Sequence, residues 1–353
     1  MPQTTIREVA RAAGVSIGSA SDILSDTPRC RYRPDTVARV RAAAAQSGYR
    51  PDALARSLRR GRTNFVGVTI GAGTAPVLSA LVVHIRTALA AHGFQPVLAD
   101  LPGTTPDGVR PGDLTPSNFA GIISADLAFE TAPLPRSLVE ACPTVAVYPT
   151  SNADLDCVTV DRARAMEMAV AHLIELGHHR IAFTCLSDGE HPTNEPKLRG
   201  WHAAKARYGI DPDGRYSIPV PKEFAGPRTR GHYVADALAA LDPLPSALIA
   251  TSDDIALSVS GVLTGRGWRL PENLSVIGFD GVFYAEYVWP PLTTVAQPLE
   301  RIAEEAAARL KSLVDARRAG RPLPPARTLV EPQLIVRNST LPFASWKQPR
   351  FAG

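Results

Sequence analysis

Apolar residues repeat at helical spacing through the first fifty positions of the chain. Thr5 and Glu8 fit a capping box, which predicts that a short helix begins there and ends at Gly14. Ser16 fits the cap of a second short helix, and a third is expected over residues 34–47. Two short helices around a glycine-centred turn predict a helix-turn-helix, whose second helix lies in the DNA major groove.

From Phe65 onward, short apolar runs alternate with segments of helical period. Strands are expected at Phe65–Ile70, Pro96–Ala99, Gly121–Ser124, Thr144–Val147, Ile181–Leu186, Ala247–Ala250 and Val276–Phe279. Helices are expected at Pro76–His92, Arg162–Gly177, Glu195–Gly209 and Asp253–Gly267. This alternation predicts an α/β body of parallel sheets covered by helices on both faces, and its length predicts two lobes. Ligands of such folds bind at the carboxyl ends of the strands.

Composition allows a small head and a large body, because 45% of the 353 residues are hydrophobic and 20% are charged. Residues 1–63 carry twelve arginines, no lysine and five acidic residues, so their net charge is +7. The remaining 290 residues carry 26 basic and 29 acidic residues, so their net charge is −3. This division is expected when only the head meets phosphate, although twelve arginines taken alone fit solvated surface charge equally well. Together with the helix-turn-helix, it predicts double-stranded DNA as a partner.

The start of the chain, Met-Pro-Gln-Thr-Thr-Ile, lacks the basic and apolar run of a secretory signal, and no apolar run is long enough to span a bilayer. The cysteines lack C-x-x-C spacing; they are Cys30, Cys142, Cys157 and Cys185. We therefore expect reduced thiols in the cytoplasm, an association with the nucleoid, and no membrane partner or cofactor. Three histidines near a helix C-terminus are expected to cap carbonyls or lie at the surface rather than bind metal; they are His172, His178 and His179.

Three separate segments of the head together resemble the lactose/galactose repressor family of bacterial regulators. They are Thr5–Ser16, Gly48–Pro51 and Ala55–Leu58, in the family's order and nearly its spacing, although the loop Asp26–Arg33 is longer than usual. Segments of the body also follow the family's order: Val158–Asp161, His172–His178, Leu198–Trp201, Asp253–Leu257, Ser275–Asp280 and Pro290–Val295. The resemblance covers residues 4–340 and implies a core of the periplasmic-binding-protein type, in which two lobes clamp a small effector.

The resemblance also implies which residues of the head contact DNA. Base edges would be read by Ile17, Gly18 and Asp22. Phosphates would be held near Thr5, Ser16, Ser19 and Ser21. The hinge positions are Ala55, Leu58 and Arg59; the leucine would wedge into a central minor-groove step, and the arginine would follow it along the groove.

This head departs from the family at the reading positions. Members usually carry a long polar side chain near Ile17 or Gly18 and an arginine at the position of Asp22. Isoleucine can contact a thymine methyl, whereas a carboxylate accepts from cytosine N4 and is repelled by phosphate. We therefore expect an unfamiliar operator and a greater dependence on the loop arginines Arg29, Arg31 and Arg33.

The implied effector-binding residues are Gly73, Tyr148, Lys197, Phe224, Ser252 and Asp280. Asp280 matches a family carboxylate that accepts hydrogen bonds from ligand hydroxyls or amines. Lys197 replaces a common arginine, which exchanges a planar fork for a point charge. Ser252 replaces an asparagine and Tyr148 a frequent aspartate, and both losses remove groups that suit sugars. Either the effector is not a simple sugar, or the pocket has weakened and these residues only pack.

Other functions fit isolated motifs. Gly14–Gly18 matches the G-x-S-x-G nucleophile elbow, but a helix rather than a strand precedes it. Gly71–Pro76 and the later Asp100 imitate a dinucleotide fingerprint, but Pro76 replaces its third glycine. A solute-binding protein without regulation is disfavoured by the basic head. We therefore expect no enzyme activity.

Together these inferences divide the chain into four regions: a helix-turn-helix domain at 1–49, a hinge at 50–63, a two-lobed effector-binding and dimerisation core at 64–340, and a poorly ordered tail at 341–353. The expected function is that of a homodimeric repressor whose affinity for a pseudo-palindromic operator is modulated by an effector. The helices Pro76–His92 and Leu299–Leu313 are the candidates for its dimer face.

Overall fold

A computed structural model describes residues 5–24, 32–49, 63–70, 75–100, 118–125, 136–150, 152–187, 196–221 and 226–349 of the chain. The chain forms two compact units, Met1–Asn64 and Phe65–Gly353. Each unit is described by itself.

The first unit is a bundle of three helices, α1 (Ile6–Ala13), α2 (Ile17–Ile23) and α3 (Pro34–Gln46). Its core consists of small and β-branched residues: Val9, Ala10, Ala13, Ala20, Ile23, Val40, Ala43 and Ala44. Gly14 ends α1 in the left-handed conformation, with φ of 64°, and Ser16 caps α2 by accepting a hydrogen bond from the Ser19 backbone at 3.1 Å. The predicted pair of short helices is confirmed.

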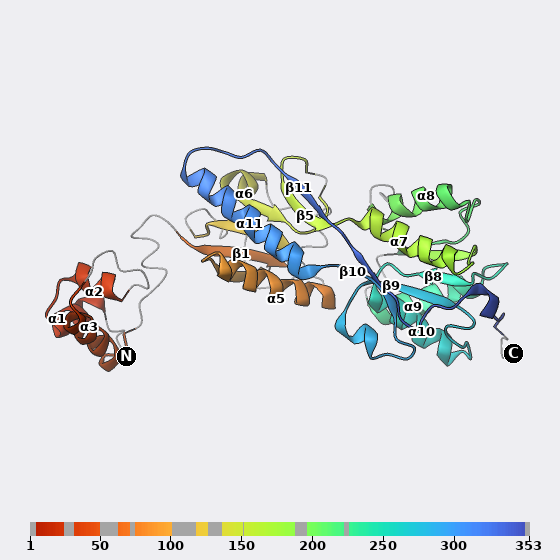
Figure 1. Cartoon of the computed structure of the whole chain (residues 1–353), viewed down its shortest axis with the longest axis horizontal. Coiled ribbons are helices and arrows are strands. Elements are labelled where there is room, and N and C mark those ends of the chain that lie inside the picture. Colours follow the sequence, from red (N-terminus) through yellow and green to blue (C-terminus); the bar gives the residue numbers. More distant parts are fainter. Residues whose placement is uncertain are drawn as a thin grey trace. The chain divides into compact units, whose positions relative to one another are not determined.

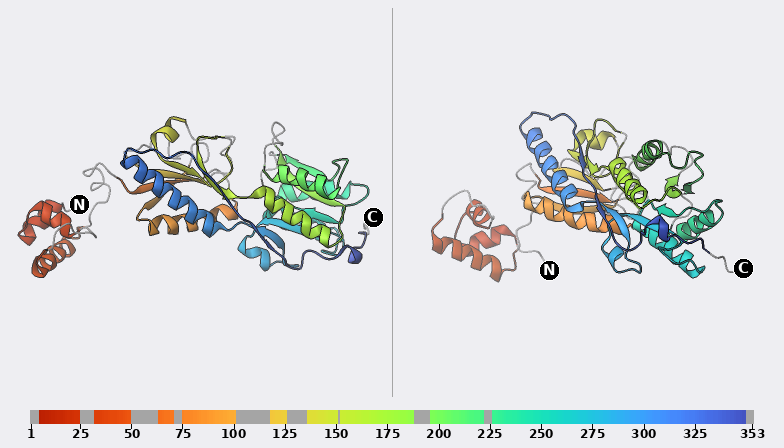
Figure 2. Two further views of the ribbon diagram at one scale, coloured as in Figure 1. Left: turned by 45° about the horizontal axis from the view of Figure 1, so that its top comes forward. Right: turned by 45° about the vertical axis from the view of Figure 1, so that its right-hand side comes forward.

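The second unit contains two lobes, each built on one sheet (Figure 1). The first sheet is entirely parallel and has the order β11 (Arg327–Val330), β5 (Asp156–Val160), β4 (Thr144–Ala146), β3 (Gly121–Ala125), β1 (Phe65–Ile70), β2 (Gln95–Asp100). Its helices are α5 (Pro76–Ala91), α6 (Arg136–Ala141) and α11 (Leu299–Arg318). The views agree that α5 and α11 lie side by side along this lobe (Figure 2).

The second sheet has the order β12 (Gln333–Ile335), β10 (Thr293–Ala296), β9 (Ser275–Asp280), β8 (Ala247–Ile249), β6 (Ile181–Ser187), β7 (Ser217–Pro221). All its neighbours are parallel except β12, which runs antiparallel to β10. Its helices are α7 (Arg162–Glu175), α8 (Pro196–Tyr208), α9 (Pro227–Ala239) and α10 (Asp253–Gly265), followed by the 3-10 turn η3 (Phe283–Glu286). Trp201 on α8 is fully buried and packs on Phe183 of β6.

The chain passes between the lobes at three described connections, from β5 to α7, from β10 to α11 and from β11 to β12. Residues that end the strands of each sheet, such as Ala125 and Asp280, are therefore the ones placed to meet a ligand. The predicted α/β class with a helical head is confirmed.

Some elements were not foreseen from the sequence. The strand β7 contains two prolines, which the pattern of a central strand excludes but an edge strand tolerates. β11 and β12 are short and half-exposed, so they lack a run of apolar residues. α9 contains Gly231 and has few apolar positions, and α11 continues to Arg318, beyond its predicted end at Leu313.

The tail after Thr340 differs from the expectation, since residues 341–349 pack against the second lobe rather than remaining poorly ordered. The backbone N–H of Phe343 donates to Leu176, and the indole N–H of Trp346 donates to the backbone oxygen of Asn273 at 2.9 Å. The Arg180 guanidinium lies over both aromatic rings of this segment, which stack on each other. Ring stacking, the Arg180 contacts and the backbone hydrogen bonds therefore hold this short polar tail in place.

Two histidines anchor this tail: the expected surface position is wrong for His178, which is buried but does meet a carbonyl, whereas His179 is exposed. His178 is buried, and its ring nitrogens pair with the Ser246 hydroxyl at 2.9 Å and the Leu341 carbonyl at 2.8 Å. His172 pairs with the Thr340 hydroxyl at 3.1 Å. Burial lowers the pKa of both imidazoles below its ordinary value. The carbonyl that His178 meets belongs to the tail rather than to α7.

Candidate functional site

The second helix of the head presents one face to solvent and one to the core. Ile17 is 40% exposed and Gly18 is exposed, whereas Ala20 and Ile23 are buried against the other helices. Ile17 is not among the residues that form the apolar core of this bundle. The face that was assigned to reading bases from the sequence is thus available to a partner.

The other head positions assigned from the sequence fall into two groups. Ser16 and Ser19 join their hydroxyls at 3.0 Å at the start of α2, where backbone N–H groups are available to an anion. Ser21 and Asp22 are half-buried. The hydroxyl and the backbone N–H of Thr5 both donate to Glu8, at 3.2 and 2.7 Å. The start of α2 therefore fits the phosphate role better than Thr5 does.

Arg33 is exposed directly before α3, so its guanidinium can extend into solvent. The remaining head and hinge positions lie outside the described residues; they are Arg29, Arg31, Ala55, Leu58 and Arg59. Of the effector positions, Gly73 and Phe224 also lie outside them.

In the second lobe, Asp280 ends β9 in a backbone conformation that side chains rarely adopt, with φ of 121°. Its Oδ1 accepts a hydrogen bond from the Gln297 side chain at 2.7 Å. Burial raises the pKa of Asp280 to about 6, and the nearby cations of Lys197 and Arg162 partly oppose that rise. Asp280 is therefore a carboxylate held near cations where ionisation is costly, as in a ligand site.

Lys197 enters the same region from α8. Its ammonium donates to the Thr251 carbonyl at 2.7 Å and lies 3.5 Å from the centre of the Phe279 ring. The side chain is buried, and its charge acts on Asp280. Ser252 follows Thr251 and caps α10 by accepting from the Ile255 backbone at 3.3 Å. The predicted residues Lys197, Ser252 and Asp280 thus lie together in the second lobe, and Asp280 ends its strand β9.

Tyr148 is the predicted effector residue of the first lobe that lies near Asp280 and Arg162. It follows β4 and is 3% exposed, and the guanidinium of Arg162 lies 5.2 Å from the centre of its ring. Burial, followed by the charge of Asp280, raises the pKa of Tyr148 above its ordinary value. The phenol is therefore neutral and close to the carboxylate of the other lobe.

Three buried hydroxyls at this edge of the first sheet find no hydrogen-bond partner among the described residues; they belong to Thr69, Ser124 and Tyr148. Thr69 and Ser124 are register partners on β1 and β3, near the carboxyl ends of those strands. A buried hydroxyl without a partner is costly unless water or a ligand supplies one. This edge is therefore where an effector would be most strongly stabilised by the first lobe.

Sequence reasoning missed three members of the cluster. Arg162 was assigned only to a helix, and Asp253 and Asp254 only to a family segment. Asp253 is fully buried, and burial together with the charge of Asp280 raises its pKa to about 7. Tyr284 donates its hydroxyl to Asp254. The consecutive carboxylates Asp253 and Asp254 could have drawn attention to this segment, but the sequence does not show which residues they contact.

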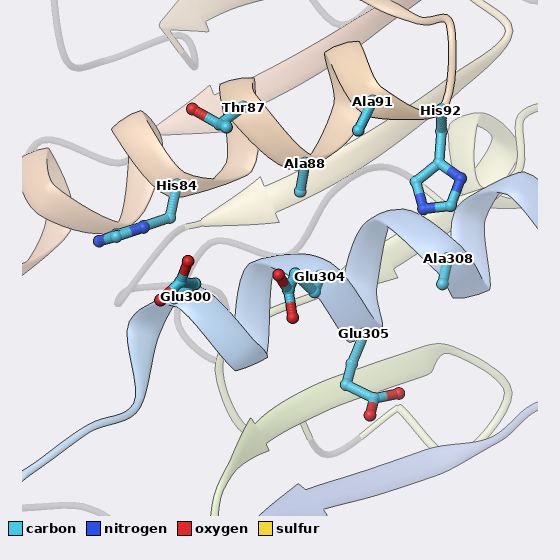
Figure 3. Close-up of a pocket in the computed structure, with 9 residues that line it drawn as sticks. All are labelled: His84, Thr87, Ala88, Ala91, His92, Glu300, Glu304, Glu305 and Ala308. Carbon is cyan, nitrogen blue, oxygen red and sulfur yellow. The ribbon is translucent and has the colours of Figure 1, made fainter.

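A separate hollow lies on the first lobe between α5 and α11, the two helices nominated for the dimer face. Figure 3 shows His84 and His92 at α5, with Glu300, Glu304 and Glu305 on α11. Within the described part of the chain, no group of three histidine, cysteine or acidic residues is placed to hold a metal ion. The hollow therefore remains a charged surface groove.

Comparison with known proteins agrees with this architecture. Residues 5–52 match the family described as "Bacterial regulatory proteins, lacI family", and residues 170–340 match the "Periplasmic binding protein-like domain". The ribose operon repressor of Escherichia coli (strain K12) is 30% identical over 310 residues, which cover 86% of this chain and 90% of the repressor.

Two solved structures extend the likeness. A complex of the transcriptional regulator CelR with cellobiose is 26% identical, with a TM-score of 0.66, over 96% of this chain and 100% of that one. A lac repressor dimer bound to operator and the anti-inducer ONPF is 20% identical, with a TM-score of 0.78 and the same coverage, and shows the shared fold.

A helix-turn-helix head joined to a two-lobed binding core defines a DNA-binding transcription regulator. The chain belongs to the lacI family of bacterial regulatory proteins, as the resemblance predicted. Members of this family are transcriptional regulators rather than enzymes, so the nucleophile-elbow and dinucleotide interpretations of the sequence are wrong. No helix of the described segments has the length and apolar character that crossing a membrane requires.

Proposed function

We propose that this regulator is a repressor that binds a pseudo-palindromic operator as a homodimer, in the cytoplasm at the nucleoid, and that a small effector between its lobes sets its operator affinity. The observation that carries the DNA half is the face of α2 that leaves Ile17 and Gly18 exposed in a head of net charge +7. Exposed side chains at the start of such a helix read bases, and the arginines hold phosphates.

The operator is identified by selecting DNA from a random pool with the purified protein and then measuring affinity against scrambled DNA. We expect a palindromic site and an affinity that falls steeply with salt. Ile17→Ala should reduce the preference for operator, because it removes an apolar base contact. Arg33→Ala should weaken operator and scrambled DNA alike and lower the salt slope. Equal affinity of the unaltered protein for the two DNAs excludes the proposal.

The hinge would order as a helix on DNA and insert Leu58 from both chains at the operator centre. This step rests on the resemblance and on the way minor-groove binders insert an apolar side chain between base steps to kink the duplex. Leu58→Ala should leave the free protein folded and remove the bend of the operator, measured by fluorescence transfer between labelled DNA ends. A bend that survives the substitution would refute the wedge.

The effector half rests on the cluster of Tyr148, Lys197 and Asp280, with Ser252 beside it and Gly73 and Phe224 implied by the resemblance. Two of the similar solved proteins contain cellobiose or ribose. We propose a polar metabolite, either a sugar derivative or another small molecule, that donates to Asp280 and accepts from the cations. Ribose, galactose, cellobiose and their acid and amine derivatives should be screened by thermal shift, with Asp280→Asn as the variant that loses the response.

The homodimer would use the first-lobe helices α5 and α11 and an aromatic surface on the second lobe. Phe283, Tyr287 and Trp289 are 77%, 75% and 91% exposed, and aromatic side chains so exposed mark an interface. Trp289→Ser should raise the dimer dissociation constant in sedimentation. Leu329→Ser is the matched control, because it removes an exposed apolar side chain from the edge strand β11.

A further inference from the structure

The segment after Asp280 turns sharply from β9 into η3, and it holds two consecutive residues at positive φ. Asp280 has φ of 121° and Gly281 has φ of 74°. A Cβ on Gly281 would lie 2.5 Å from that of Ala296, so only glycine fits. A non-glycine residue such as Asp280 keeps an unfavourable conformation only where its surroundings over-determine it.

The buried carboxylate of Asp253 lies at the centre of these surroundings. It projects from the first turn of α10, where the helix N-terminus favours a negative charge. Its Oδ2 accepts the backbone N–H of Val282 at 2.8 Å, and its Oδ1 accepts the hydroxyl of Thr294 on β10 at 2.6 Å. One side chain therefore joins α10, β10 and the turn after Asp280.

Strand β9 has a glycine where the Asp253 carboxylate packs against it. A Cβ at Gly278 on β9 would lie 2.1 Å from the Oδ1 atom of Asp253, so any larger residue would displace it. The next residue of α10, Asp254, accepts the hydroxyl of Tyr284 two positions beyond Val282. Consecutive carboxylates thus hold the same turn at two points.

We propose that Asp253 is a positioning residue that fixes the turn 280–282 and so aims the carboxylate of Asp280 at the effector. The inference rests on the proposed effector role of Asp280. Asp253 itself is fully buried, so it acts through the backbone that follows Asp280 rather than by contact with a ligand from solvent. A turn fixed before binding spares the effector the cost of ordering it.

The test is hydrogen exchange of the full-length protein without effector, followed in peptides covering residues 280–286. Asp253→Ala should speed exchange there about tenfold, because it removes the acceptor of the Val282 backbone N–H. Asp253→Asn keeps an acceptor for the Val282 N–H and should restore most of the protection. Thr294→Val is the matched control, because it removes the other donor to the same carboxylate and leaves the turn bond in place.

Val282→Pro keeps the test valid if Asp253→Ala fails to fold. Val282 has φ of −64°, which proline also adopts, so this variant deletes the donated N–H without straining φ, although it also replaces a buried side chain. It should also speed exchange of residues 283–286. Unchanged exchange in these variants, or acceleration spread evenly over the second lobe, overturns the proposal. Because no effector is present, failure of the effector role shows separately, as an Asp280→Asn variant whose ligand response equals that of the unaltered protein.

Discussion

The strand ends of the first lobe and those of the second lobe carry different kinds of polar group. On the first lobe, Thr69, Ser124 and Tyr148 offer neutral hydroxyls that lack partners among the described residues. On the second lobe, Asp253 and Asp280 are carboxylates held by named donors, with cations close by. One edge is neutral and incompletely hydrogen-bonded, whereas the other is charged and fixed in place.

This difference indicates where recognition and adaptability lie. Buried charges that are held in place bind a ligand strongly, because they are oriented before the ligand arrives. Their desolvation, however, lowers the stability of the free protein. Hydroxyls rotate and both donate and accept, so they accommodate different ligand groups. The second lobe would therefore determine the ligand's charge, and the first lobe would adapt to its polar pattern.

The largest expected effect comes from removing the ionisable group of Asp280. Its pKa in the folded protein is about 6, above the ordinary value of 3.8, so the folded state binds the proton more tightly than the unfolded chain. The stability this gives is complete below pH 4 and is lost as the pH rises through 6. Asp280→Asn should thus be more stable than the unaltered protein by about 3 kcal/mol at pH 7.

Urea unfolding at pH 4 and pH 7 measures this difference. The two proteins should agree at pH 4, where the aspartate is already protonated, and diverge as the pH rises. Asp213→Asn is the control, because that carboxylate is exposed and pairs with Arg215 at the surface. A variant of Asp280 that is less stable at pH 7 would show that the charged edge stabilises the free protein, which reverses the comparison.

The sequence predicted the architecture well, but it predicted only some residues of the candidate effector site. Helical spacing around Gly14 and the strand run Phe65–Ile70 are local signals, and the structure confirms both elements. Lys197, Ser252 and Asp280 followed from the family resemblance, which transfers positions along the chain. Their neighbours did not follow, because Asp253 meets Val282 and Thr294 only through the sheet register.

The tail shows the same limit. Its prolines and polar residues predict disorder, and composition alone gives no reason to doubt that. The order arises from Arg180, which lies over Phe343 and Trp346, and from His178, which pairs with the Leu341 carbonyl. These contacts join residues more than 160 positions apart, and no local pattern encodes them.

A second, smaller effect is expected from Lys197→Met, which keeps the aliphatic stem and removes the charge. The substitution leaves the Thr251 carbonyl without the Lys197 donor. It also removes the cation that most lowers the pKa of Asp280. We expect a loss of about 2 kcal/mol in the free energy of unfolding and a further rise in the pKa of Asp280. Carbon-13 NMR titration of the aspartate carboxyl measures the second quantity.

Lys311→Met is the matched control for that loss, because Lys311 is half-exposed on α11 and pairs with Asp315 one turn away. Exposed pairs of this kind contribute about 0.5 kcal/mol or less. Equal losses from the two substitutions would mean that Lys197 behaves as a surface charge, and the second edge would then not be fixed as described.

The smallest effect on stability, and the sharpest test of the first edge, is expected from Tyr148→Phe. Its hydroxyl is buried without a partner among the described residues, so removing it relieves a desolvation cost and breaks no protein hydrogen bond. Stability should stay unchanged or rise by up to about 1 kcal/mol.

Tyr216→Phe is the matched control: that ring is also buried, but its hydroxyl donates to the Pro243 carbonyl at 2.8 Å, so we expect a loss of about 1 kcal/mol. If Tyr148→Phe costs as much as its control in urea unfolding, the first edge is already hydrogen-bonded in the free protein. If it costs nothing and yet weakens effector binding in the thermal-shift screen, the hydroxyl finds its partner only in the ligand.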